Sequence, residues 1–328
     1  MIKMVRMRWK SPAVLFLLCT APLAAQVKVT EGTNQVSVEI GGKPYSTFVY
    51  GPDVMKAYLF PLRAADGTIL TRGFPMEKVA GESTDHPHQR GVWFAHSDVN
   101  GFDFWNNEAT YTTKNRGTIK VVKITKTRSG AASGEIDAQL EWRDPNGKPL
   151  LREDRAMVFA QGDANRSIDF DFTLTAIEPV KFGDEKDGVF GIRVAPWLEA
   201  TGQKNQPAEP LRTLHMTNAD GATGEKQVWG KRSNWVDYSG QAPDGKKYGI
   251  AIFDNPDNPR HPAYWHARGY GLFANNIFGE RAFTGDKSKD GGMQLAPGEK
   301  LHFRYRVVIH PGDATDAHLS DLYASYAH

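Results

Sequence analysis

Hydrophobic and polar residues alternate along most of the chain after residue 26. The clearest case is segment 301–309, in which every second position carries a large apolar side chain. A period of two is typical of a β-strand with one buried face. The same pattern predicts strands within 27–49 and over 58–62, 68–71, 118–127, 135–142, 151–159, 167–174, 189–195, 228–238, 247–253 and 271–277.

Turn residues separate these strands about every eight to twelve positions. Helical spacing of apolar residues occurs in segment 314–327, where Leu319, Leu322, Tyr323 and Tyr326 fall on one face. We find no break in composition that would divide the chain. We therefore expect a single domain over residues 26–328. Its predicted fold is all-β, a large antiparallel β-sandwich with a short C-terminal helix at about 314–327.

The first 25 residues have the order of a secretory signal peptide. Basic residues within 1–10 precede the apolar run 13–19, and small residues follow it up to Ala25. We expect cleavage near Ala25 and a secreted protein, most simply a periplasmic one. Cys19 is the only cysteine, so the mature chain would have no disulfide and no cysteine ligand for a metal.

Charge and motifs exclude several classes of function. A net charge of +2 is too small to favour nucleic acid as a partner. After the leader, the chain has no apolar run of about twenty residues, the length that a membrane-spanning helix needs. Motifs for nucleotide phosphates, dinucleotides, a serine nucleophile elbow or a zinc-protease helix are missing from the sequence. The oligomeric state is not fixed by the sequence.

Segment 85–105 concentrates histidine, arginine and carboxylate side chains. Pro87 favours an extended backbone, and in an extended chain His86, His88 and Arg90 would share one face. Imidazole exchanges protons near neutral pH, so we assign His86 and His88 to acid/base catalysis. Arg90 would fix a carboxylate or stabilise an oxyanion. The substrate-binding residues predicted in this segment are Gln89, His96, Asp98 and Trp105.

A second cluster of the same kind lies in segment 255–281. His266 is a third candidate acid/base group, with Arg268 on its strand face and Trp265 opposite. We expect Trp265, Arg268 and Asn276 to bind substrate, and the role of Glu280 stays open. Two proline-rich loops that each lead into a strand would serve one concave site, with His86 or His88 within roughly 10 Å of His266. The alternative is that each loop caps a different end of the sandwich.

The residue types of the two clusters favour a carbohydrate ligand. A tryptophan stacks on the C–H face of a sugar while polar neighbours bind its hydroxyls, which suits Trp105 and Trp265. A metal site is a second interpretation, because His86, His88 and a third histidine such as His96 could bind a divalent ion. The fourth ligand cannot be named, so the cofactor remains unknown, with a divalent metal as the candidate.

Several stretches resemble a bacterial family commonly labelled "methane oxygenase, PmoA-like". They are Asp85–Gly91 with Trp93–Phe94, Gly101–Trp105, Asn255–Pro256 with Trp265–His266, and Gly271–Leu272. The resemblance covers most of the mature chain and implies a supersandwich similar to the galactose-mutarotase type, found among secreted glycan-handling proteins. The methane-oxidising subunit of that name is a bundle of membrane-spanning helices. This chain lacks such segments, so we do not expect oxygenase activity.

Together, the clusters and the resemblance predict a periplasmic carbohydrate-active enzyme. It would act on a sugar or glycoside as a lyase, hydrolase or epimerase, with histidines as acid/base groups. A non-catalytic carbohydrate-binding protein and a metal-dependent enzyme that uses His86 and His88 are the alternatives. The sequence does not determine the sugar or the bond.

Overall fold

The computed structural model describes residues 26–113, 115–162, 164–203, 206 and 211–328. The predicted signal peptide, residues 1–25, lies outside the described residues. The strands are β1 (Val27–Gly32), β2 (Gln35–Ile40), β3 (Lys43–Val49), β4 (Tyr58–Leu59), β5 (Val92–His96), β6 (Thr118–Arg128), β7 (Ser133–Arg143), β8 (Pro149–Gln161), β9 (Arg166–Ala176), β10 (Val180–Phe182), β11 (Gly188–Arg193), β12 (His215–Asn218), β13 (Trp235–Gln241), β14 (Lys247–Asp254), β15 (Tyr264–Ala267), β16 (Leu272–Asn276), β17 (Met293–Leu295) and β18 (Lys300–Pro311).

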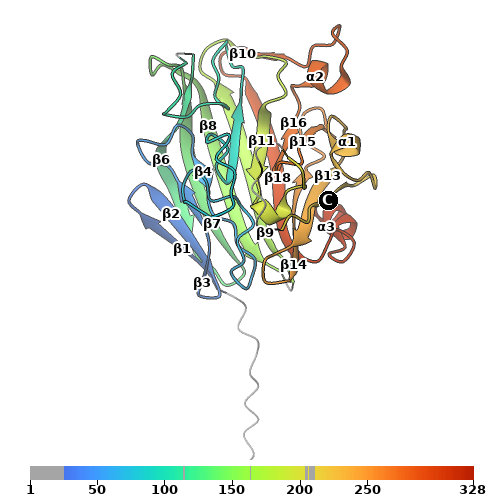
Figure 1. Ribbon diagram of the computed structural model, residues 1–328. Coiled ribbons are helices and arrows are strands. Elements are labelled where there is room, and N and C mark those ends of the chain that lie inside the picture. Colours follow the sequence, from blue (N-terminus) through green and yellow to red (C-terminus); the bar gives the residue numbers. More distant parts are fainter. Residues whose placement is uncertain (1–25, 114, 163, 204–205, 207–210) are drawn as a thin grey trace, which may run out of the picture.

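Most of these strands form two eight-stranded antiparallel sheets (Figure 1). The first sheet has the order β1-β2-β3-β4-β5-β11-β16-β15, and the second has the order β12-β13-β14-β18-β9-β8-β7-β6. Strands β10 and β17 pair separately. The all-β sandwich predicted from the alternation of apolar residues is thus confirmed.

Aromatic side chains from both sheets interlock in the core. Phe94 of β5 stacks on Phe172 of β9, with ring centroids 4.1 Å apart. Phe190 of β11 stacks on Tyr305 of β18 at 4.7 Å. Because side chains alternate along a strand, the neighbours of Phe94 and Phe190 must point to the face of the first sheet turned away from the core. We call this face the outer face of the first sheet.

Loops cover the middle of this outer face. Every residue of β5 and β11 is buried, which requires cover on both sides of the sheet. Trp105 supplies part of it. A Cβ at Gly191 would lie 2.8 Å from the Trp105 indole, so only glycine lets the ring approach the sheet this closely. Strand β5 is entered through Gly91, which has a φ of 52° and where a Cβ would meet the carbonyl oxygen of Leu59.

The helices are short and lie at the periphery. They are the 3-10 turn η1 (Pro196–Leu198) and the α-helices α1 (Glu225–Val228), α2 (Glu280–Thr284) and α3 (Leu319–Tyr326). In Figure 1, α1, α2 and α3 lie on the side of the molecule opposite the blue N-terminal strands. The predicted C-terminal helix is present, but it begins at Leu319 and not at 314, because His318 has a left-handed φ of 50°. No described helix has the length and apolar composition that crossing a membrane requires.

Three predicted strands are absent or shorter in the structure. The strand predicted over 58–62 is reduced to Tyr58–Leu59. Segment 68–71 makes isolated bridges, such as that between Thr71 and Val194, in place of a continuous ladder. Within 228–238 the strand begins only at Trp235, because Glu225–Val228 forms a helical turn before it. In all three places apolar residues are buried without regular strand pairing. A period of two alone cannot distinguish such residues from those of a paired strand.

A buried ion pair joins β13 and β18 inside the second sheet. His310 Nε2 lies 3.0 Å from Asp237 Oδ1, and His310 Nδ1 lies 3.2 Å from the carbonyl oxygen of Pro311. Both ring nitrogens face acceptors, so both carry a proton in the favoured state. Burial lowers the pKa of His310, but the charge and hydrogen bond of Asp237 outweigh it and raise the pKa above its ordinary value of 6.5.

Because of the His310–Asp237 pair, we expect the protein to become less stable as the pH rises into the alkaline range. The raised pKa means that the stabilisation is complete below pH 6.5 and is lost as the pH rises through the folded-state pKa. Urea unfolding at several pH values above 6.5 should show a declining free energy of unfolding. His310→Gln should flatten that decline. An unchanged slope in the variant would contradict the assignment. Burial lowers the pKa values of His88, His96 and His266, so these three groups lower the free energy of unfolding as the pH falls below 6.5.

Candidate functional site

The candidate site is centred on Asp85, whose carboxylate is bound by two buried arginines. Arg72 Nη1 donates to Asp85 Oδ1 at 2.7 Å, and Arg193 Nη2 donates to the same oxygen at 3.1 Å. Both arginine side chains are 0% exposed, whereas that of Asp85 is 42% exposed. Burial raises the pKa of Asp85, but a hydrogen bond from His86 and the charges of both arginines lower it far below its ordinary value. Asp85 is therefore an oriented anion at the protein surface.

His86 completes an Asp–His dyad. Its Nδ1 lies 2.8 Å from Asp85 Oδ2, and its side chain is 41% exposed. The imidazole stacks in parallel on the ring of Tyr270, with centroids 5.2 Å apart. His86 also has a left-handed φ of 44°, which costs a non-glycine residue energy. Asp85 and Tyr270 together hold the ring, and its other nitrogen, Nε2, makes no hydrogen bond with the described residues.

The loop that carries the dyad is fixed by contacts from remote parts of the chain. Arg72 donates to the backbone oxygens of Asp85 and His86, each at 2.9 Å. Arg193 Nη1 donates to the amide oxygen of the buried Gln89 at 2.5 Å, and its guanidinium lies 4.8 Å from the centre of the Tyr270 ring. Gln89 therefore acts as a support of the loop.

His88 points inward, unlike His86. Its Nδ1 lies 2.8 Å from the Tyr111 hydroxyl, and its Nε2 is buried without a hydrogen-bond partner among the described residues. Burial, with the charge of Lys56 next in size, lowers the pKa of His88 to about 2, so the ring is neutral at physiological pH. The expected common face of His86, His88 and Arg90 is not formed, because the left-handed turn at His86 breaks the extended alternation.

Arg90 and Lys56 form a second charged group next to His88. Arg90 makes a two-point ion pair with the buried Glu108, at 3.0 and 2.7 Å. Lys56 donates to the backbone oxygen of Trp105 and to Asn107 Oδ1. Burial lowers the pKa of Lys56 to about 7, although the charge of Glu108 opposes the shift. Arg90 is thus already neutralised by a protein carboxylate.

His266 lies on the outer face of the first sheet but in a different environment. It is in register with Ala274, Gly191 and Trp93 across four strands, about 14 Å from Trp93 at about 4.8 Å per strand. Its Nδ1 lies 3.1 Å from the carbonyl oxygen of Lys186. Burial lowers its pKa to about 4, and its buried Nε2 has no partner among the described residues.

The segment around His266 reaches the dyad through Tyr270. Tyr270 follows β15 in the turn that leads to β16, and its ring lies between His86 and two arginines, Arg193 and Arg268. The half-exposed Arg268 also pairs with Glu225 at 2.8 Å. The two sequence clusters therefore make contact through Tyr270, a residue that the sequence analysis did not select.

Three of the predicted substrate ligands instead hold backbone together. His96 is fully buried, and its Nε2 lies 2.9 Å from the carbonyl oxygen of Gly183. Asn276 donates to the carbonyl oxygens of Glu185 and Lys186. Asp98 accepts from the backbone of Gly101 in a turn. Their polar atoms are occupied by the fold, so we assign them structural roles. Glu280, whose role the sequence left open, is half-buried and lies 3.9 Å from Lys289.

Trp105 and Trp265 also require a correction. Trp105 is 1% exposed and packs edge-on against Trp93, with centroids 4.9 Å apart. Trp265 is 0% exposed, and its Nε1 donates to the carbonyl oxygen of Ser233 at 2.8 Å. Neither indole has a free face for a sugar ring. The aromatic rings beside the dyad are those of Tyr111 and Tyr270.

The burial of Trp265 changes the expected effect of its removal. Trp265→Ala should destabilise the protein by about 3–5 kcal/mol, the range for truncation of a buried large aromatic side chain. Chemical unfolding measures this directly. Affinity for ligand, measured on the folded fraction, should change little. A variant with wild-type stability and reduced ligand affinity would contradict the packing role.

The described residues do not support a metal-dependent interpretation. They contain no group of three His, Cys, Asp or Glu side chains placed to hold a metal ion. The Nδ1 atoms of His86 and His88 are engaged by Asp85 and Tyr111. The rings of the two histidines are 5.6 Å apart and nearly perpendicular.

Sequence reasoning missed the residues that build the site around segment 85–90. They are Lys56, Arg72, Glu108, Tyr111, Arg193 and Tyr270. No local motif marks them, since they come from separate loops and strands. One usable signal was the presence of arginines within otherwise apolar strands: Arg193 ends the buried strand β11, and a buried arginine requires a counter-charge.

Comparisons with known proteins define the family. The chain belongs to a family of unknown function, DUF6807, whose model matches residues 35–324. None of the curated proteins compared with the chain matches it.

Among solved structures, the chain is similar to a galactose mutarotase-like protein from Lactobacillus casei, with a TM-score of 0.36, 11% identity and coverage of 87% of this chain and 100% of that one. For galactose 1-epimerase from Lactobacillus acidophilus the values are 0.37, 8%, 88% and 99%. For the GH36 α-galactosidase AgaA from Geobacillus stearothermophilus they are 0.38, 10%, 88% and 40%, so the chain spans two fifths of that protein. With TM-scores below 0.5, these likenesses carry no argument about function.

The two ion pairs of Asp85, with Arg72 and Arg193, form a clamp. We expect this clamp to stabilise the fold, whatever reaction the site catalyses. Asp85→Asn removes the negative charge shared by two buried guanidinium groups. We expect a loss of about 1–3 kcal/mol, less than for a fully buried pair because Asp85 is partly exposed. Urea unfolding measures the loss. Asp98→Asn is the control, since asparagine can still accept the turn hydrogen bond from Gly101. Equal stability of the two variants would refute the role of the clamp.

Proposed function

We propose that this protein is a periplasmic carbohydrate-active enzyme in which His86, oriented by Asp85, acts as the general base. The observation that carries the proposal is the dyad itself. A carboxylate bound by two buried arginines holds Nδ1 of a half-exposed imidazole. Such a carboxylate fixes the tautomer in which Nδ1 carries the proton, leaves Nε2 as the acceptor, and stabilises the imidazolium that forms.

The neighbouring groups suit a reaction that begins by removing a proton. The rings of His86, His88 and Tyr111 form a continuous series, with centroids 5.6 and 5.9 Å apart. Tyr111 is half-exposed, and its hydroxyl, which pairs with His88 Nδ1, is a group that can both donate and accept a hydrogen bond. One base and one hydroxylic donor are the minimum for an epimerisation, and the same base would serve an elimination.

Hydrolysis of a glycoside is less well supported. Most glycosidases use two free carboxyl groups that flank the scissile bond. Asp85 is held by Arg72 and Arg193, and Glu108 is held by Arg90. Both carboxylates are therefore committed to protein cations. Within the classes expected from the sequence, an epimerase or a lyase fits the site better than a hydrolase.

A sugar is the ligand class that suits the surface of the site. Tyr111 offers a ring and a hydroxyl, His86 offers an acceptor nitrogen, and the exposed groups carry little uncompensated charge because the ion pairs are internal. Alternating aromatic and neutral hydrogen-bonding groups match the C–H faces and hydroxyls of a sugar ring. A non-catalytic carbohydrate-binding protein would use the same surface and is the second candidate.

A measurement of turnover distinguishes the enzyme from the non-catalytic binding protein. Aldoses, uronic acids and glycosides would be followed by proton NMR in deuterium oxide, which reports exchange between anomers, exchange of C–H protons and elimination. For a substrate found in this way, His86→Ala should lower kcat/KM by about 10²- to 10⁴-fold, the usual contribution of a positioned general base. Ligand affinity should change by a few fold at most.

His302→Ala is the matched control, because His302 is also half-exposed and paired with an aspartate, Asp171, but lies on the second sheet. It should leave turnover unchanged. Full activity of His86→Ala would refute the catalytic role. Sugar binding without turnover of any member of the panel would favour the binding protein.

A further inference from the structure

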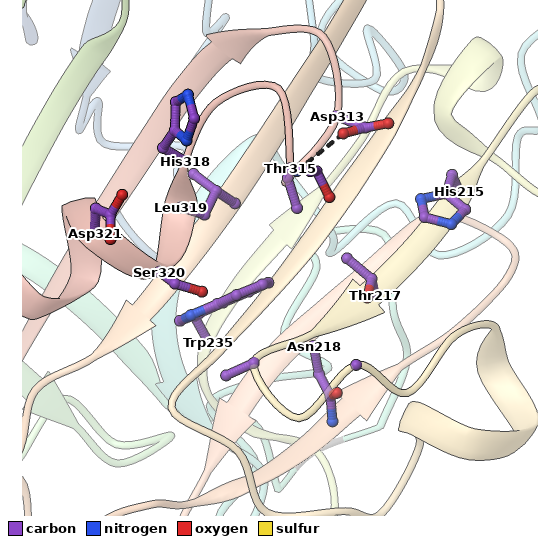
Figure 2. Close-up of a pocket in the computed structure, with 13 residues that line it drawn as sticks. His215, Thr217, Asn218, Trp235, Asp313, Thr315, His318, Leu319, Ser320 and Asp321 are labelled. Atoms are coloured by element: carbon purple, nitrogen blue, oxygen red, sulfur yellow. Dashed lines mark hydrogen bonds between the residues drawn. The ribbon is translucent and has the colours of Figure 1, made fainter.

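A pocket of about 350 Å³ lies at the edge of the second sheet, between β12, the start of β13 and the loop that leads into α3. It shares no residue with the dyad or its supports. Figure 2 shows Trp235 and Leu319 between His318 on one side and His215 on the other. Thr217, Asn218, Thr315 and Asp321 also line it. The volume exceeds that of several water molecules and is in the range of small-ligand sites.

Trp235 supplies this pocket with an indole N–H that the fold does not use. The residue is 5% exposed and packs with Phe253, Leu319 and Tyr323 in a small core under α3. Its Nε1 has no acceptor among the described residues, yet this atom is not closed off from solvent, as it is in Trp93 and Trp229. A buried indole normally finds a partner for its N–H. Here a pocket ligand or water must supply the acceptor.

The rim offers both donors and acceptors that the fold leaves free. The imidazoles of His215 and His318 are exposed and make no hydrogen bond within the described chain. Asp313 Oδ1 accepts from the backbone of Thr315 and Asp316, which fixes the carboxylate and leaves Oδ2 available. Mixed donors and acceptors around an aromatic side chain match vicinal hydroxyl groups better than they match an anion or an apolar ligand.

The cavity extends beyond this first pocket. A second pocket of about 290 Å³ shares His215 and Asp313 with the first and is lined by Thr213, Ser239, Gln241 and Lys247. Two adjoining pockets on either side of the same pair of side chains suit a ligand made of consecutive rings. The left-handed backbone of His318, whose carbonyl oxygen caps Asp321 and Leu322, keeps the rim loop in place at the start of α3.

We propose that these adjoining pockets form a second binding site for a neutral glycan, with one sugar unit hydrogen-bonded to Trp235 Nε1 and the next beyond His215 and Asp313. The proposal does not rest on catalysis by His86. The site would hold a polymeric or branched substrate while the dyad acts elsewhere, or would bind glycan in a protein without turnover.

Saturation-transfer and titration NMR test the site, with methyl β-D-galactopyranoside, methyl β-D-glucopyranoside, lactose, cellobiose and maltose as probes. At least one disaccharide should bind, and more tightly than the monosaccharide glycosides. Trp235→Phe keeps the aromatic packing and removes the N–H, so it should weaken binding by about 3- to 10-fold, the usual effect of one net hydrogen bond. Asp313→Asn keeps the turn acceptor and should weaken binding by a similar factor.

Two control variants separate this site from the dyad. Trp229→Phe removes an indole N–H outside the pocket, and His86→Ala removes the base of the dyad. Both should retain the disaccharide affinity of the wild type. If Trp235→Phe does not fold, Asp313→Asn carries the test. Absence of binding by every probe, wild-type affinity in Asp313→Asn and in folded Trp235→Phe, or loss of all binding in His86→Ala would overturn the proposal.

Discussion

One carboxylate facing two buried guanidinium groups determines the shape of the candidate site. Arg72 and Arg193 are both withdrawn from water, and each disfavours the charge of the other. Removing two cations from water is costly unless anions and oriented carbonyl groups surround them. Asp85 supplies the anion at the surface end, and the backbone oxygens of segment 85–89 supply the dipoles. The loop is therefore arranged around the arginines, and the position of His86 follows from that arrangement.

The architecture of the sandwich allows this burial of charged side chains on the outer face of the first sheet. Its core is closed by stacked aromatic rings from both sheets, so the outer face of the first sheet need not carry the main hydrophobic interaction. Loops can then cover that face with a mixture of tryptophan, arginine and lysine. The buried Trp93 and Trp105 pack together over Gly191, while Tyr111 and Tyr270 are half-buried.

The fold could be predicted from the sequence more fully than the site. The alternation in 301–309 reappears in the long strand β18, because burial on one face of a sheet imposes a period of two. Segment 85–90 was singled out by composition, but its geometry could not be predicted from the sequence. A left-handed residue before a proline has no signal in periodicity, and the partners of Asp85 lie 13 and 108 positions away. The tryptophans were misassigned because composition does not reveal whether an indole faces the core or the solvent.

The backbone of His86 has a consequence for how this chain can diverge. At a φ of 44° glycine carries no steric penalty, whereas a residue with a side chain, histidine included, does. Drift without selection should therefore favour its replacement by glycine. A histidine at this position in a diverged copy of the chain would indicate that the imidazole is still in use. A glycine there would indicate a copy that has kept the fold but no longer uses an imidazole at this position.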